Sequence, residues 1–81
     1  DSILIYPNPV ISGSIVRIKN VPIDARVNIY SIAGRRMAEN LSPNSFGEVL
    51  WYIPNNISSG LYFVFISTGD EKKISKFAII K

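Results

Sequence analysis

Apolar residues alternate with polar residues along this chain, and short groups of Pro, Gly, Asn and Ser repeatedly interrupt the alternation. Side chains of a β-strand point alternately to opposite faces, so a period of two is typical of half-buried strands. No segment keeps the three-to-four spacing of a helix over three turns. Isoleucine is the most abundant residue, and β-branched and aromatic residues favour strands. The pattern therefore predicts an all-β chain.

The interruptions divide the chain into about seven strands. We expect them at residues 3–6, 14–19, 26–32, 35–41, 49–53, 61–67 and 72–80. The segment 35–41 is polar enough for a sheet edge. The segment 61–67 is apolar on both faces, which predicts a central strand that is covered on both sides. This strand count and spacing indicate an immunoglobulin-like antiparallel β-sandwich, formed as a single domain over residues 1–81.

One face of each predicted strand supplies the expected core. Its members are Val16, Ile18, Val27, Ile29, Trp51, Tyr62, Val64, Ile66, Phe77 and Ile79. Between the third and fourth strands, Ala33-Gly34 is predicted to form a tight hairpin turn in which Gly34 adopts a positive φ.

Composition argues against catalysis. The 81 residues include no Cys and no His, so thiol nucleophiles, the usual neutral-pH base and the commonest transition-metal ligand are all missing. We therefore predict a non-enzyme with no catalytic, cofactor-binding or metal-binding residues. No apolar run approaches the ~18 residues of a transmembrane helix. The net charge of +3 is spread along the chain, and without a basic cluster we expect no nucleic-acid partner.

Four short motifs follow one another along the chain. They are Tyr6-Pro7-Asn8-Pro9-Val10, the run from Val27 to Arg35, Ser59-Gly60-Leu61-Tyr62-Phe63-Val64, and the lysine-punctuated ending from Lys73 to Lys81. In this order and spacing they resemble the C-terminal sorting domain of the type IX (Por) secretion system of Bacteroidetes-type bacteria. Related immunoglobulin-like modules of flagellar hook-capping proteins share much of the pattern. The resemblance covers essentially the whole chain.

The resemblance implies a secretion signal. Such a domain directs a covalently linked upstream cargo protein through the periplasm and across the outer membrane, to the cell surface or the medium. Its partners would be the outer-membrane secretion machinery and a surface sortase-like peptidase that removes the domain. Lys81 is then expected to be the natural C-terminus.

The candidate recognition residues come from these motifs, and each also has a structural interpretation. They are Pro7, Asn8, Pro9, Gly60, Tyr62, Lys73, Lys76 and Lys81. The two prolines and the asparagine would end the first strand and make a turn, or contact a receptor directly. Gly60 is interpreted as a turn glycine, and Tyr62 as a buried ring whose hydroxyl reaches a loop carbonyl. The lysines would protect a sheet edge, be read by an acidic partner, or both.

An alternative function is an accessory β-sandwich of a secreted hydrolase, which binds carbohydrate or packs on a neighbouring domain. Tyr30, Phe63 and Phe65, predicted to face outward, would supply the stacking rings. The two functions place different requirements on where the domain lies in the full protein. A sorting signal must be C-terminal, and a binding module need not be.

Overall fold

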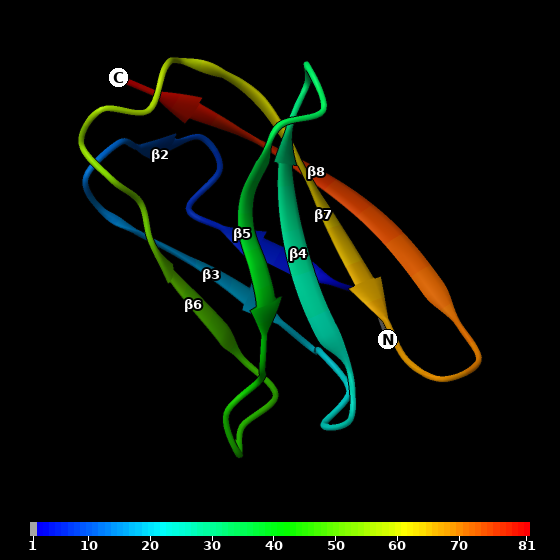
Figure 1. Cartoon of the computed structure of the whole chain (residues 1–81). Coiled ribbons are helices and arrows are strands. Elements are labelled where there is room, and N and C mark those ends of the chain that lie inside the picture. Colours follow the sequence, from blue (N-terminus) through cyan, green and yellow to red (C-terminus); the bar gives the residue numbers. More distant parts are fainter. Residues whose placement is uncertain (1) are drawn as a thin grey trace.

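The computed structural model describes residues 2–81, and this part of the chain consists of eight strands without a helix (Figure 1). The strands are β1 (Leu4–Tyr6), β2 (Val10–Ile11), β3 (Ile15–Lys19), β4 (Arg26–Ser31), β5 (Arg36–Leu41), β6 (Val49–Tyr52), β7 (Gly60–Ser67) and β8 (Lys72–Ile80). These residues therefore include no helix that is long and apolar enough to cross a membrane.

The strands form two sheets that pack as a sandwich. The smaller sheet has the order β1-β3-β6, and the larger has the order β2-β8-β7-β4-β5. Every pairing is antiparallel except that of β2 with β8, which is parallel. The predicted all-β, immunoglobulin-like sandwich is thus confirmed.

The seven predicted strands are all present, and β2 is an eighth that the sequence pattern did not indicate. This strand has only two residues, Val10 and Ile11, which lie between Pro9 and Ser12. Two residues cannot show an alternation, so the segment looks like part of a loop until its pairing with β8 is known.

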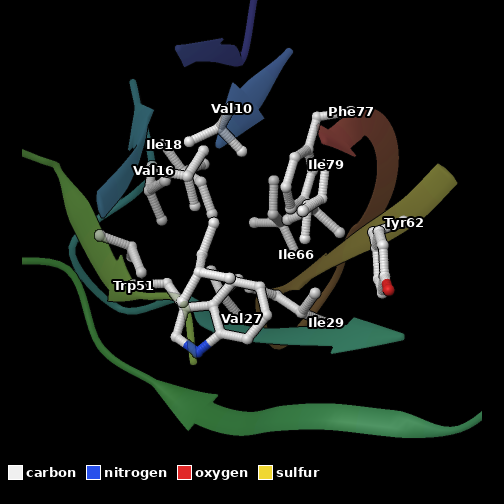
Figure 2. Close-up of a cluster of buried hydrophobic side chains, with 14 of the residues drawn as sticks. Val10, Val16, Ile18, Val27, Ile29, Trp51, Tyr62, Ile66, Phe77 and Ile79 are labelled. Carbon is white, nitrogen blue, oxygen red and sulfur yellow. The ribbon is translucent and has the colours of Figure 1, made fainter. Parts of the chain in front are cut away.

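The core lies between the two sheets, and all ten residues predicted for it are buried (Figure 2). It also contains Val10, Val21, Ala25, Val49, Ile53 and Ile57. Among the described residues no polar or charged side chain is buried with them, apart from the Tyr62 hydroxyl on its aromatic ring. Burial of apolar surface at about 25 cal/mol per Å² therefore drives the association of the sheets.

The positions of two strands test the predictions about edges and centres. β5 lies at an edge of the larger sheet and β7 lies in its interior, as predicted. However, β7 is covered on one face only. Phe65 is 37% exposed, and Leu61 and Phe63 are half-buried on the same outer face. The expectation of two covered faces was wrong because the described chain forms only two layers, and neither layer covers the outside of the larger sheet.

The β4–β5 hairpin turns as the sequence predicts. Gly34 has a φ of 88°, a left-handed conformation that other residues adopt at a cost. The turn is closed by the Gly34 amide, which donates to the Ser31 carbonyl at 2.9 Å, and by the Ser31 amide, which donates to the Arg35 carbonyl at 2.8 Å. The β4–β5 hairpin lies at the same end of the sandwich as the C-terminal end of β8 (Figure 1).

Candidate functional site

Three of the four sequence motifs meet at the end of β8. In the sheet register, Ile79 lies opposite Val10 of β2 on one side and opposite Gly60 of β7 on the other. The last residues of the strand are therefore flanked by the Pro-Asn-Pro motif and by the Ser-Gly-Leu-Tyr motif, which stand about fifty residues apart in the sequence. At this point the fold brings together motifs that the sequence separates, although the paired residues Val10 and Ile79 are themselves buried.

The Pro-Asn-Pro motif connects the first strand to the last. Asn8 Oδ1 accepts a hydrogen bond from the Ala78 backbone N–H at 3.0 Å. After β2, the Ser12 amide donates to the Ile80 carbonyl at 2.8 Å. Pro7 and Pro9 both follow cis peptide bonds, and both side chains are exposed. The motif thus has an architectural role, while its exposed proline rings face solvent.

Tyr62 occupies the position predicted for it. Its ring is 5% exposed and packs on Phe77, with the ring centroids 6.1 Å apart. Its hydroxyl donates to the Ser58 carbonyl at 2.7 Å, so the buried polar group is satisfied and the loop before β7 is fixed. Gly60 begins β7 with a φ of 156°, and no atom lies within 4 Å of the place that a Cβ would occupy. Its backbone conformation, rather than close packing, accounts for a glycine there.

The lysines of the last motif lie along an exposed strand. β2 pairs only with Ile79 and Ile80, so within the described chain the outer edge of β8 from Lys72 to Phe77 has no strand beside it. Lys76 lies opposite Phe63, on the outer face of the sheet.

Lys73 points the other way. It lies opposite the buried Ile66 and therefore shares the core-side face, yet its side chain is exposed because it stands near the end of the sandwich. Charges directed inward at a free edge are one way in which proteins discourage strand-to-strand aggregation.

Lys81 is also exposed, and its backbone N–H donates to Ser59 Oγ at 2.8 Å. The candidate residues thus all lie on β8 or beside it, from Lys73 near its start to Lys81 after its end. Tyr62 is buried, and the prolines and lysines are exposed.

The aromatic residues predicted to face outward gather on the larger sheet. Tyr30 and Phe65 meet edge to face, with ring centroids 5.2 Å apart and planes at 78°. Together with Phe63 they line a shallow hollow of about 440 Å³. The three rings and Ile32 give the hollow an apolar part that an apolar group could cover, and Asn28, Ser31, Ser67 and Lys72 add polar groups.

Sequence reasoning missed one further feature near β8. A second hollow, of about 370 Å³, separates the β4–β5 hairpin from the loop between β6 and β7. Its walls include Ser31 and Arg35 on one side, and Ser59 and Tyr62 on the other. These residues belong to the second and third sequence motifs, but only the fold brings the two motifs together.

Charged side chains make few contacts with one another among the described residues. Within residues 2–81, no group of three or more Asp and Glu residues is placed to hold a metal ion. The one salt bridge there, between Arg36 Nε and Glu39 Oε1 at 2.7 Å, is exposed. What the surface offers is a free strand edge, exposed lysines and two hollows.

These features define a class of protein: an immunoglobulin-like recognition domain whose distinctive residues surround its last strand. The chain matches the family described as "Secretion system C-terminal sorting domain" over residues 4–81, and it belongs to that family. It is therefore a type IX secretion sorting domain, as the motifs predicted, and the family implies a non-catalytic role. The match gives no support to the alternative of a carbohydrate-binding or domain-packing accessory module.

A solved structure shows the same architecture. The chain aligns over its whole length with part of PorZ, which is described as an essential bacterial surface component of the type IX secretion system of Porphyromonas gingivalis. The sequence identity is 26% and the TM-score is 0.85. This chain spans 12% of the length of that protein. No curated protein matches the chain by sequence.

Proposed function

We propose that this domain carries a covalently linked upstream cargo protein from the periplasm across the outer membrane, and that the secretion machinery recognises the region around β8. A sortase-like peptidase at the cell surface would then remove the domain. The cargo would end at the surface or in the medium. The family assignment supports an exported destination. The position of the candidate residues around β8 is our reason for proposing recognition there.

One observation carries this proposal: the lysine-bearing motif lies along β8, whose edge from Lys72 to Phe77 has no neighbouring strand in the described chain. The other two motifs hold the end of the same strand. An exposed edge presents backbone N–H and C=O groups that a partner strand can pair with, and flanking side chains then supply specificity. Lys73 and Lys76 lie along that edge on opposite faces, so a partner that adds a strand there would meet both charges.

The test separates recognition from stability. We would fuse the domain to the C-terminus of a periplasm-directed reporter, in a host that has the type IX machinery. The test variant carries Lys73→Ser with Lys76→Ser. Its control carries Arg17→Ser with Lys19→Ser, which removes two positive charges from β3 on the other sheet.

We expect the wild-type and control fusions to reach the surface or the medium. The test variant should stay in the periplasm although it remains folded. Export of the test variant at the wild-type rate would remove the lysines from the recognised surface. A wild-type fusion that never leaves the periplasm would contradict the proposed function itself.

A further inference from the structure

The hollow between the β4–β5 hairpin and the β6–β7 loop has an apolar floor and a polar rim. Ile57 and Tyr62 form buried parts of its wall, and Met37 and Leu61 are half-buried there. Ile32 is 69% exposed beside them. An apolar side chain from another molecule could therefore be covered on several sides.

The polar groups of this hollow are suited to donate hydrogen bonds. Ser31 Oγ accepts from the Arg35 backbone N–H at 3.1 Å, and in the described chain the Ser31 hydroxyl acts only as an acceptor. Its own proton is therefore free to donate to a ligand. Arg35 adds a guanidinium, whose five N–H groups are all donors.

The charge of Arg35 is not neutralised locally. It is the only charged residue that lines the hollow, and no carboxylate lines it. Its neighbour Arg36 is different, because Arg36 pairs with Glu39 in the one salt bridge within residues 2–81. The hollow thus combines an unpaired guanidinium with hydroxyl groups and an apolar floor.

Acidic residues cluster at the far end of the domain. Of the five that lie within residues 2–81, all but Glu39 belong to the loops opposite the hairpin: Asp24, Glu48, Asp70 and Glu71 (Figure 1). The domain is 33 Å long, whereas charges in physiological salt are screened over about 8 Å. These carboxylates are therefore too distant to neutralise Arg35.

We infer that this hollow binds an acidic peptide segment of a protein partner, with Arg35 holding a carboxylate and the floor covering the apolar side chain beside it. A guanidinium binds a carboxylate through two parallel hydrogen bonds, which fixes orientation as well as adding affinity. A single arginine is too little to follow a nucleic-acid backbone, which requires several phosphate contacts. The inference rests on the proposed function, because the partner would belong to the secretion machinery.

The first experiment measures binding directly. The ¹⁵N-labelled domain would be titrated with a capped peptide of alternating glutamate and leucine, and with the same peptide carrying glutamine in place of glutamate. We expect amide shifts in residues 31–35 and 58–61 with the acidic peptide alone. Arg35→Gln should weaken binding by about tenfold, as the loss of a charged partner in a contact does. Arg36→Gln is the matched control and should leave binding within about twofold, because its charge is already paired.

The second experiment measures export of the reporter fusion. Arg35→Glu should slow export by about tenfold, because it places like charges together. Arg36→Gln should have little effect, and circular dichroism would show that both variants remain folded. Wild-type export of Arg35→Glu, or peptide shifts that are absent or lie elsewhere, would overturn the inference while leaving the sorting function intact. Failure of the wild-type fusion to be exported would instead count against the sorting function. The titration would still show whether the hollow binds the acidic peptide.

Discussion

Individual side chains hold the end of β8 through groups distant in sequence. Asn8 and Ala78 are seventy positions apart, yet the asparagine side chain takes the place of a missing strand partner for the Ala78 N–H. Tyr62 acts on the other side of β8, where its ring supports Phe77 and its hydroxyl fixes the loop at Ser58. Each of these contacts can be removed separately.

Substitutions of Tyr62 test how much its buried ring and its hydrogen bond to Ser58 stabilise the domain. Tyr62→Ala should lower the free energy of unfolding by roughly 3–5 kcal/mol, because it deletes a large buried ring. Tyr62→Phe keeps the ring and loses only the hydrogen bond to Ser58, so it should cost about 1 kcal/mol. Denaturant unfolding measures both. A cost below about 1 kcal/mol for the alanine variant would contradict the burial of this ring.

Asn8 tests the link between the first loop and the last strand. Asn8→Ala should lower the free energy of unfolding by about 0.5–1.5 kcal/mol and speed hydrogen exchange at the Ala78 amide. Asn8→Asp, which retains an acceptor oxygen, is the control and should keep most of the protection. Unchanged exchange in the alanine variant would show that the hydrogen bond does not protect this amide.

The strand β8 combines two environments along its length. Its end is paired on both sides, by β2 and β7, whereas its beginning has a partner only in β7. The lysines stand along the part with the free edge. The same lysines are therefore candidates for two roles, protection of the strand edge and recognition by a partner. Measuring aggregation of lysine variants tests the first role independently of the second.

Replacing both lysines with an apolar residue should remove the charges that protect the free edge of β8. Lys73→Val with Lys76→Val should aggregate faster on warming, because charges that discourage edge-to-edge pairing are lost. Arg17→Val with Lys19→Val is the control. It changes the same number of charges on β3, which is paired on both sides. Light scattering measures the rates, and equal aggregation of the two variants would argue against a protective role for the lysines.

As a whole, the molecule is a sorting domain with an apolar core, and its sequence contains no histidine or cysteine. We expect no tight zinc binding by calorimetry and no turnover of chromogenic esters or glycosides, because the usual ligands and general bases are missing. Reproducible turnover that disappears when one carboxylate is replaced would contradict this expectation.

Local pattern alone was enough for the fold class and for seven of the eight strands. The alternation of Val16 with Arg17, or of Val27 with Asn28, determines which side chains face inward wherever a strand forms, since strand periodicity is a property of the backbone itself. The ten core residues followed from this rule, and so did the hairpin turn at Gly34. The motif order was also sufficient to identify the family.

Tertiary structure decided everything that depends on pairing between distant segments. The strand β2 exists because Val10 and Ile11 meet β8, and the exposed face of β7 follows from the number of layers. Lys73 and Phe77 are four residues apart in one strand, so the sequence alone implies that both side chains point to the core-side face. The exposure of Lys73, however, depends on where the opposite sheet ends. Arg35 became a candidate only when two loops closed a hollow around it. Sequence periodicity describes neighbours along the chain, whereas a surface site is made of neighbours in space.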